Sequence, residues 1–396
     1  MFSYRHAFHA GNHADVLKHF VLIQLLEYLN QKDAAYTYID THSGAGVYAL
    51  DDKFAAKTAE YDTGIGKLWD RKDLPPALKE YVDLIKSMNP SGKMRYYPGS
   101  PFCADKVARD QDRLRLFEMH PADVRLLADN FGKLQAHAAE QGIRPPQRGK
   151  RVMIERSDGF AALKPLLPPP SRRALVLIDP PYEDKNDYRY VKDALELALG
   201  RFPQGVYAVW YPLLQRMESR QFADKLKRLP AKEWLNVTLT TRTPGPDGVG
   251  LHSSGMFVLN PPYTLEATLR ETMPYLVQVL GTDAGATFVI EKGTQVTGAA
   301  GARIMPDGTV RTPRNNPIGK GSLRVPGQAP DSAPAPRARG ADTVAGRPGR
   351  APARPAEAGS GRPGGAPARS QRPRPAAAAG AAKEGTPAPR AGRARK

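Results

Sequence analysis

The residues best suited to chemistry are Asp179, Pro180, Pro181 and Tyr182, which follow the apolar run Ala174–Ile178. The exocyclic amine of adenine is a poor nucleophile because its lone pair is delocalised into the ring. The Asp179 carboxylate and the Pro180 carbonyl would accept hydrogen bonds from both N–H groups of such an amine, on a backbone that the prolines hold stiff. Stacking of Tyr182 on the base would add roughly 1–3 kcal/mol. The pattern indicates methylation of a base amine, and the alternative is a strand that ends in a proline-rich turn.

A second copy of this pattern, Asn260-Pro261-Pro262-Tyr263, follows the apolar residues 255–259. Both forms suit methylation of an amine. If the cofactor loop lies near residue 40, the Asp179 segment follows the fourth strand of the chain and the Asn260 segment follows the last. We therefore assign the catalytic role to Asp179 and interpret Asn260 as part of a strand-ending turn.

Seven short apolar segments predict the strands that would position these residues. They are residues 36–39, 114–118, 152–154, 174–178, 205–211, 237–241 and 256–259. The last two are joined without an obvious helix, so we expect an antiparallel hairpin. Six parallel strands and one reversed strand, interleaved with helices, predict a three-layer α/β domain with a mostly parallel, seven-stranded sheet. Such sheets bind ligands where their strands end.

Three polar segments at predicted strand ends are candidates for contacts with a nucleotide cofactor. The loop over residues 40–46, Asp-Thr-His-Ser-Gly-Ala-Gly, would let its backbone approach a ligand closely, or would form a plain glycine turn. A dinucleotide site would also need an acid about 20 residues later, and the next predicted strand ends much further on. Glu118 ends the second strand and would bind ribose hydroxyls, or be a surface carboxylate. Asp158 follows the third strand and would contact the cofactor's adenine, or cap the helix that begins near Phe160.

Residues 47–95 interrupt the alternation of strands and helices and predict a small helical insertion. We expect helices over residues 55–69 and 76–88, although Gly64 and Gly66 weaken the first of these. Further on, Ser100 followed by Pro101 has the pattern of an N-cap and a first helical position.

The first twenty residues combine a predicted helix with many polar side chains. Asn12 is expected to cap the helix and Asp15 to lie in its first turn. Its apolar face would consist of Leu17, Phe20, Val21, Leu25 and Tyr28. Four nearby histidines raise the question of a metal, but neither an H-E-x-x-H arrangement nor a cysteine pair is present. We favour a basic, aromatic arm that contacts phosphate or a substrate base, and simple solvated histidines are the alternative.

The positive charge of the chain is concentrated in its last hundred residues. The 396 residues carry a formal net charge of +18, and residues 301–396 hold 19 Lys and Arg against 5 Asp and Glu, with no aromatic residue. This segment has too little apolar surface to offset the entropy of ordering. We therefore expect residues 1–295 to form the folded domain and residues 296–396 to be a disordered basic tail rich in Arg, Pro, Ala and Gly.

The remaining composition points to the cytoplasm. The single cysteine, Cys103, excludes an internal disulfide and fits a reducing compartment. The N-terminal residues lack the pattern of a signal peptide, and no apolar run reaches membrane-spanning length. A cytoplasmic protein without a membrane partner is the prediction.

Five segments together resemble the RlmJ-type 23S ribosomal RNA adenine-N6 methyltransferases over roughly residues 1–290. The longest and most specific is residues 4–19, Tyr-Arg-His-Ala-Phe-His-Ala-Gly-Asn-His-Ala-Asp-Val-Leu-Lys-His. The others are residues 40–46, 97–101, 157–159 and 178–183. The resemblance implies a Rossmann-like class I methyltransferase fold, S-adenosylmethionine as the methyl donor and one adenine of 23S ribosomal RNA as the acceptor.

The resemblance also implies roles for individual residues. Those near the cofactor would be His19, His42, Ser100, Glu118, Asp158, Gly159 and Asp179. Those that act on the amine would be Asp179, Pro180 and Tyr182, and those nearest the substrate RNA would be Tyr4, His6 and Lys18. We expect a monomer without a metal, and the basic tail lies outside the resemblance.

Three other functions stay open on the sequence alone. The sequence Asp-Pro-Pro-Tyr does not distinguish DNA from RNA, so a DNA adenine-N6 methyltransferase would carry the same residues. A non-catalytic RNA-binding protein acting through the basic tail would account for the charge. A metalloenzyme built on the N-terminal histidines is the third alternative.

Overall fold

The structure is a computed structural model that describes residues 6–50, 59–140, 151–245, 250–294, 303–304 and 310–311. These residues all belong to one of the two units into which the chain divides, Met1–Asn315. Tyr4 and nearly all of the predicted basic tail lie outside the described residues. The same holds for residues 55–58 of the first predicted insertion helix.

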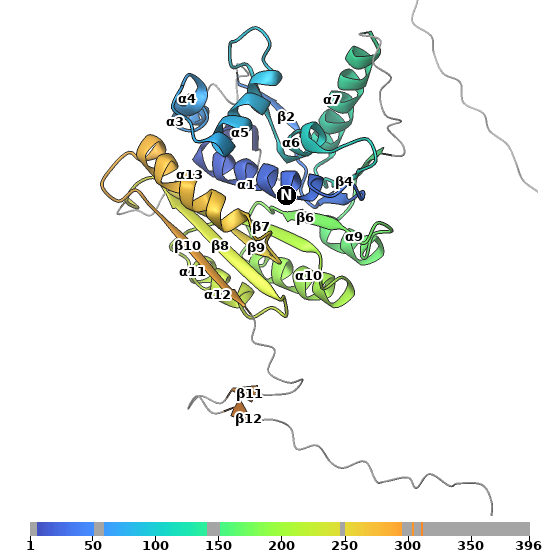
Figure 1. The fold of residues 1–396 in the computed structure, drawn as a ribbon, viewed down its shortest axis with the longest axis vertical. Coiled ribbons are helices and arrows are strands. Elements are labelled where there is room, and N and C mark those ends of the chain that lie inside the picture. Colours follow the sequence, from blue (N-terminus) through green and yellow to red (C-terminus); the bar gives the residue numbers. More distant parts are fainter. Residues whose placement is uncertain are drawn as a thin grey trace, which may run out of the picture. The chain divides into compact units, whose positions relative to one another are not determined.

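An eight-stranded sheet forms the centre of this unit, in the order β10-β8-β9-β7-β6-β1-β4-β5 (Figure 1). Its strands are β1 (Thr37–Asp40), β4 (Arg113–Phe117), β5 (Val152–Glu155), β6 (Ala174–Ile178), β7 (Val206–Pro212), β8 (Glu233–Thr240), β9 (Ser253–Leu259) and β10 (Thr287–Thr294). Strands β7, β6, β1, β4 and β5 pair in parallel. Strand β8 points the same way, whereas β9 and β10 are reversed. The carboxyl ends of six strands therefore meet at one edge, where α/β folds bind ligands.

This topology confirms the predicted mostly parallel α/β fold. All seven predicted strands are present, and β8 and β9 form the expected hairpin. The structure adds an eighth strand, β10, which pairs with β8 at the edge of the sheet. Residues of β10 alternate between half-buried and exposed. Its apolar run is limited to Phe288, Val289 and Ile290 and is followed by the charged Glu291 and Lys292, and the segment is absent from the predicted strands.

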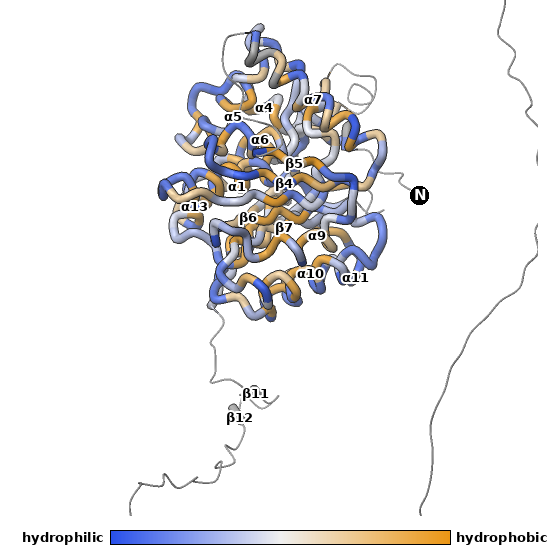
Figure 2. Tube along the Cα trace, turned by 90° about the vertical axis from the view of Figure 1, so that its right-hand side faces the viewer, coloured by the Kyte–Doolittle hydropathy of each residue, from blue (hydrophilic) through white to orange (hydrophobic). Residues whose placement is uncertain are grey.

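Helices cover both faces of the sheet, which is thus the middle of three layers. One face packs against α1 (His13–Asn30), α5 (Pro76–Ser87), α6 (Ser100–Val107), α7 (Pro121–Glu140) and α13 (Leu265–Leu280). The other face packs against α9 (Gly159–Leu166), α10 (Asp187–Arg201) and α12 (Phe222–Leu226). Figure 2 shows the apolar central strands between more hydrophilic outer segments.

Helix α1 lies inside the molecule, so its buried surface extends well beyond the predicted apolar face, of which Leu17, Phe20, Val21 and Leu25 are buried. Its buried residues include His13, Asp15, Lys18 and His19 as well as the apolar ones. The helix is enclosed by the sheet on one side and by α5, α6 and α13 on others, which leaves it little solvent-facing surface. The predicted cap is confirmed, because the Asn12 side chain accepts hydrogen bonds from the backbone of the first helical turn.

Between β1 and β4 the described residues form four helices, α3 to α6, and a two-stranded sheet. The sheet pairs β2 (Val47–Ala49) with β3 (Tyr96–Pro98). Helix α5 matches the helix predicted over residues 76–88. In place of the helix predicted over residues 55–69, the described part holds α3 (Glu60–Thr63) and α4 (Gly66–Trp69). A Cβ atom on Gly64 would lie 2.1 Å from the Gly11 carbonyl oxygen, so the chain needs glycine where these two helices separate.

Four short elements complete the described chain. They are η1 (His6–Phe8), α11 (Met217–Arg220) and the paired two-residue strands β11 (Arg303–Ile304) and β12 (Val310–Arg311).

A further correction concerns Ser100, which is the first residue of α6 and not its N-cap. Gly99 holds the cap position, and the Ser100 hydroxyl instead donates to Oδ2 of Asp40 at 2.7 Å. Across the described residues, every helix is too short or too polar to cross a membrane.

Candidate active site

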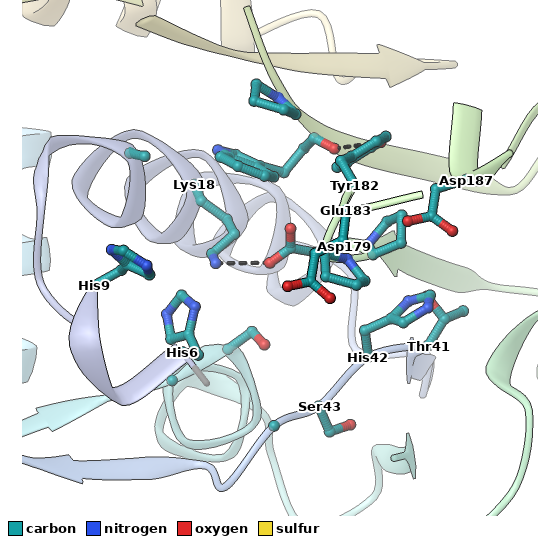
Figure 3. Close-up of a pocket in the computed structure, with 18 of the residues that line it drawn as sticks. His6, His9, Lys18, Thr41, His42, Ser43, Asp179, Tyr182, Glu183 and Asp187 are labelled. Atoms are coloured by element: carbon teal, nitrogen blue, oxygen red, sulfur yellow. Dashed lines mark hydrogen bonds and ion pairs between the residues drawn. The ribbon is translucent and has the colours of Figure 1, made fainter. Parts of the chain in front are cut away.

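A cavity of about 530 Å³ lies at the carboxyl edge of the parallel strands (Figure 3). Its walls come from the loops after β1, β4, β5, β6 and β7 and from the start of α1. It is lined by all predicted site residues that the structure describes, namely His6, Lys18, His19, His42, Ser100, Glu118, Asp158, Gly159, Asp179, Pro180 and Tyr182. Segments far apart in the sequence thus meet at one place.

A lysine on α1 holds the Asp179 carboxylate. Nζ of Lys18 donates to Oδ2 of Asp179 at 2.7 Å (Figure 3). It also donates to Oδ1 of Asp15 at 2.9 Å. Burial opposes the charge on Lys18, but the two carboxylates more than offset this and hold its pKa well above the ordinary value. The ammonium therefore stays charged across the neutral pH range.

Asp15 extends this ion pair towards the N-terminal segment. Its Oδ2 accepts hydrogen bonds from Nε2 of His6 and from the backbone N–H of Gly11, both at 2.9 Å. Burial raises the pKa of Asp15, but the charges of His6 and Lys18 outweigh burial and bring it well below the ordinary value. The sequence analysis does not predict that Asp15 holds Lys18. The signal that could have shown it is the three-residue spacing of the two residues on one helix, which places them on the same face.

The ring of Tyr182 lies beneath the cavity wall and is only 1% exposed. Its centroid is 4.7 Å from that of Tyr188 and 6.0 Å from that of Phe222. The hydroxyl donates to the backbone carbonyl of Trp210 at 2.8 Å (Figure 3). Tyr182 also has a φ of 53°, in the left-handed region that non-glycine residues adopt at a cost. Stacking of Tyr182 on a base stays a prediction, and it would require the ring to leave this packing.

Two further residues of the cavity wall are absent from the sequence-based predictions. Trp210 lies near the end of β7 and is partly buried, and the centroid of its indole lies 5.6 Å from Nζ of Lys18. Arg216, in the loop after β7, donates to the Tyr182 carbonyl at 2.7 Å. The available signal for Trp210 is its position near the end of the strand that follows the Asp179 strand in the chain.

The loop after β1 is fixed by the buried carboxylate of Asp40. It accepts hydrogen bonds from the hydroxyls of Tyr38 and Ser100, each at 2.7 Å, and from the backbone N–H of His42 at 3.2 Å. Burial raises the pKa of Asp40 to about 6, although these hydrogen bonds oppose the rise. Burial also lowers the pKa of His42 to about 4, so its ring is neutral at pH 7.

The ends of β4 and β5 supply a carboxylate and a close backbone contact. Glu118 accepts hydrogen bonds from the backbone N–H groups of Gly44, at 2.8 Å, and His120, at 2.7 Å. Burial raises the pKa of Glu118 despite these bonds. A Cβ atom on Gly159 would lie 2.1 Å from the Thr41 carbonyl oxygen, so only glycine lets α9 approach the β1 loop this closely. Asp158 caps α9 as predicted, and it also lines the cavity.

His19 also lines the cavity, and one of its ring nitrogens has no hydrogen-bond partner among the described residues. Its Nδ1 lies 2.8 Å from the Tyr97 hydroxyl, whereas its buried Nε2 has no hydrogen-bond partner in the described part of the chain. Burial lowers the pKa of His19 to about 3, so the ring is neutral. The hydroxyl of Ser157 is likewise buried without a partner among the described residues.

The other N-terminal histidines have protein partners. Nδ1 of His9 lies 3.0 Å from the carboxylate of Glu60, which raises the pKa of His9, and Asn12 donates to the same carboxylate at 2.9 Å. Nε2 of His13 lies 3.1 Å from the Leu251 carbonyl oxygen. Within the described ranges, no group of three or more His, Cys, Asp and Glu residues is arranged to hold a metal ion.

The second Asx-Pro-Pro-Tyr sequence lies where the parallel strands begin, at the end of the sheet away from the cavity. Because β9 runs against β7, its last residue, Leu259, pairs with Tyr207 near the start of β7. The Asn260 amide donates to the carbonyls of Pro203 and Gly205, at 2.8 and 2.7 Å, and so fixes a turn. Asn260 is therefore remote from the cavity, as its interpretation as a turn residue requires.

Comparison with known proteins reveals a family that spans this fold. The family described as RsmJ, Ribosomal RNA large subunit methyltransferase D, RlmJ, matches residues 33–290. Ribosomal RNA large subunit methyltransferase J of Haemophilus influenzae is 44% identical over 292 residues, which cover 74% of this chain and 98% of that protein. The protein of the same name from Escherichia coli is 43% identical over 276 residues, covering 70% and 93%.

A solved structure agrees with these sequence matches. The crystal structure of a protein from Legionella pneumophila superposes with a TM-score of 0.63 at 36% identity, covering 72% of this chain and 99% of that chain. The family match over residues 33–290 includes β1 to β9, and together with the relatives it confirms the resemblance that the sequence motifs predict. The chain belongs to the RlmJ family of ribosomal RNA large subunit methyltransferases.

Proposed function

We propose that this protein transfers a methyl group from S-adenosylmethionine to the exocyclic N6 atom of one adenine in 23S ribosomal RNA. The observation that carries the proposal is the position of Asp179, the acid of the Asp-Pro-Pro-Tyr sequence. It follows β6, which lies between β7 on one side and the β1, β4 and β5 loops on the other. In this proposal the loops after β1, β4 and β5, together with His19 of α1, would contact the cofactor, and the wall that holds Lys18 and Trp210 would contact the base.

The cavity has the groups that S-adenosylmethionine needs. The neutral ring of His19 offers an unpartnered nitrogen for the amino-acid part of the cofactor. Glu118 offers a carboxylate for ribose hydroxyls, and the Gly159 backbone leaves room for close approach. Bound there, S-adenosylmethionine would supply an electrophilic methyl group. The residues proposed to hold it are His19, His42, Ser100, Glu118, Asp158, Gly159 and Asp179.

The substrate amine would be held by the catalytic sequence. Lys18 engages Oδ2 of Asp179, which leaves Oδ1 to accept a hydrogen bond from one N–H of the adenine amine. The Pro180 carbonyl would accept from the other. These contacts would turn the N6 lone pair towards the methyl group, and such positioning supplies most of the rate enhancement. The adenine must be unpaired, or leave its stack, to reach this depth. Tyr4 and His6, with Lys18, would contact the RNA.

The remaining proposals concern the whole chain. Residues 1–295 would form the methyltransferase domain, with residues 47–95 as its helical insertion, and the protein would act as a cytoplasmic monomer. Residues 296–396 would add RNA affinity that is independent of sequence, because they carry most of the excess positive charge.

The test is methyl transfer from labelled S-adenosylmethionine to unmodified, protein-free 23S ribosomal RNA. We expect the label at N6 of one adenine with the native chain, and its loss with Asp179→Ala. The variant should retain cofactor binding within a few fold, since most proposed cofactor contacts are elsewhere. Transfer to a duplex DNA oligonucleotide without transfer to the RNA would instead favour the DNA enzyme. RNA binding without any cofactor binding would overturn the proposal and favour a non-catalytic protein.

A further inference from the structure

We infer that the indole of Trp210 is the wall against which the target adenine packs while Asp179 holds its amine. The inference rests on the proposed function and adds a substrate-contacting residue to it. It differs from the expectation for the Asp-Pro-Pro-Tyr sequence, in which the tyrosine faces the base. Its basis is the register of two neighbouring strands, together with the burial of Tyr182.

The pairing of β6 with β7 places Trp210 beside Asp179. Ile178 is opposite Val209 in the parallel register, so the next residues along the two strand directions are Asp179 and Trp210. Ile178 and Val209 both belong to the core on the α9 and α10 side. Because side chains alternate between the faces of a strand, Asp179 and Trp210 both return to the side covered by α1.

Lys18 of α1 confirms that these two side chains share one face. Its Nζ lies 2.7 Å from Oδ2 of Asp179 and 5.6 Å from the centroid of the Trp210 indole (Figure 3). Lysine, carboxylate and indole therefore enclose one corner of the cavity. A base whose amine reaches Asp179 would enter this corner, where the Trp210 indole is a large aromatic surface among the described residues.

Tyr182 serves as the support of that surface. Its ring is 1% exposed, whereas Trp210 is only partly buried and lines the cavity. The Tyr182 hydroxyl bonds to the Trp210 carbonyl at 2.8 Å, and the two ring centroids are 6.0 Å apart. Contact between a base and an aromatic side chain is favourable for any base, so Trp210 would supply affinity while Asp179 and the Pro180 carbonyl select the amine.

Steady-state kinetics with the RNA substrate measure the contribution of the indole. We expect Trp210→Ala to lower kcat/KM for RNA by about 10- to 100-fold and Trp210→Phe to lower it less, with cofactor affinity unchanged in both. Trp234→Phe is the matched control, since that indole stacks on Phe257, outside the cavity. It should keep the native kcat/KM.

Fluorescence gives a second readout that a purely structural role would not produce. The chain has three tryptophans, so Trp69→Phe combined with Trp234→Phe leaves Trp210 as the sole tryptophan, whose emission can be excited selectively over that of tyrosine. With S-adenosylhomocysteine present, an RNA oligonucleotide containing the target adenine should change this emission. The same oligonucleotide with an abasic nucleotide at that position should not.

The outcomes separate the inference from the function on which it rests. Native methyl transfer together with unchanged kinetics in Trp210→Ala, or with equal emission changes for the adenine and abasic oligonucleotides, would overturn the role of Trp210 alone. If the native chain methylates no RNA adenine, the proposed function fails and the role of Trp210 fails with it.

Discussion

At the scale of single residues, the site depends on side chains that do not face the substrate. Tyr182, Asp40 and Asp15 are all buried, and each fixes a group that lines the cavity. Their effect on the chemistry is indirect, because they set the position of Trp210, of the β1 loop and of Lys18. Substitutions at these positions should therefore separate stability from catalysis in characteristic ways.

The hydroxyl of Tyr182 provides the first prediction. Tyr182→Phe removes the hydrogen bond to the Trp210 carbonyl and should lower the free energy of unfolding by about 1 kcal/mol. It should also lower kcat, because the hydrogen bond that links the segment after Asp179 to the backbone of Trp210 is lost. Urea unfolding and single-turnover methylation would measure the two effects.

Tyr207→Phe is the matched control for that variant. The Tyr207 hydroxyl is buried in the same core and bonds to the carbonyls of Ala198 and Phe202, away from the cavity. It should cost similar stability and leave kcat unchanged. Equal losses of kcat in both variants would show that Tyr182 acts only through general stability.

Asp40 provides a prediction about pH. The pKa of Asp40 rises from 3.8 to about 6 on folding. At a pH between these two values, the carboxyl group is mostly protonated in the folded state and mostly ionised in the unfolded state. This contribution to stability is fully present below the unfolded pKa and is lost as pH rises through the folded pKa. As the pH is raised from about 4.5 to about 7.5, the ionisation of Asp40 alone should lower the free energy of unfolding by about 2 kcal/mol.

Asp40→Asn tests this assignment. Urea unfolding at the two pH values gives the change in the free energy of unfolding with pH for the native protein and for the variant. The change in the variant should be smaller by the contribution of Asp40. Identical differences in the native chain and the variant would contradict the raised pKa of Asp40.

The sequence predicts a group of residues that line the cavity, but it does not predict the partners that hold them. Asp179, Glu118 and Asp158 are recognisable because each follows a strand. The contact between Lys18 and Asp179 joins residues 161 positions apart, and only the packed fold brings them together. The burial of Tyr182 is equally invisible, because an Asp-Pro-Pro-Tyr sequence reads the same whether its tyrosine faces a ligand or the core.

At the scale of elements, periodicity predicts what packs on one side and fails where packing is unusual. The interior strands β1, β4, β6 and β7 have apolar runs and are predicted close to their observed bounds. Strand β10 lies at an edge, has only the short apolar run Phe288-Val289-Ile290, and is missing from the predictions. Helix α1 looks amphipathic in sequence because it carries polar site residues, yet these are buried along with its apolar ones.

The contact between the β1 loop and α9 gives a prediction at this scale. A methyl group at position 159 would overlap the Thr41 carbonyl oxygen, so Gly159→Ala must push the start of α9 away from the loop. We expect a loss of roughly 1–3 kcal/mol in the free energy of unfolding and weaker binding of S-adenosylmethionine. Urea unfolding and calorimetric titration would measure these.

Gly200→Ala is the comparison for that variant. Gly200 lies near the end of α10, and a Cβ atom there would have no neighbour within 4 Å. The substitution should stabilise the protein by about 0.5–1 kcal/mol, since alanine favours the helix over glycine, and leave cofactor binding unchanged. Parallel behaviour of the two variants would refute the close contact.

At the scale of the whole molecule, the excess positive charge is concentrated in the last hundred residues of the sequence. Residues 1–300 are nearly balanced, whereas residues 301–396 carry 19 Lys and Arg against 5 Asp and Glu. Composition alone reveals this division. The function of the C-terminal residues does not follow from the fold, because they lie almost wholly outside the described residues.

Deletion of residues 301–396 should therefore change RNA affinity and not the chemistry. A plot of the logarithm of the RNA binding constant against that of salt concentration should become less steep, since fewer counterions are released. The kcat with saturating RNA should stay within about twofold of the native value, because the cavity is formed by earlier residues. An unchanged slope would show that these residues make no net electrostatic contact with the RNA.

The interior position of α1 has a consequence for synthesis of the protein. The helix is made among the first thirty residues, yet it packs against β9, and His13 bonds to Leu251, 238 positions later. While the ribosome extends the chain, this largely apolar helix lacks most of the surfaces that will enclose it. Nascent chains therefore expose an aggregation-prone segment for most of their translation. Because Lys18 meets Asp179 only when much of the domain exists, truncated products should carry an incomplete active site.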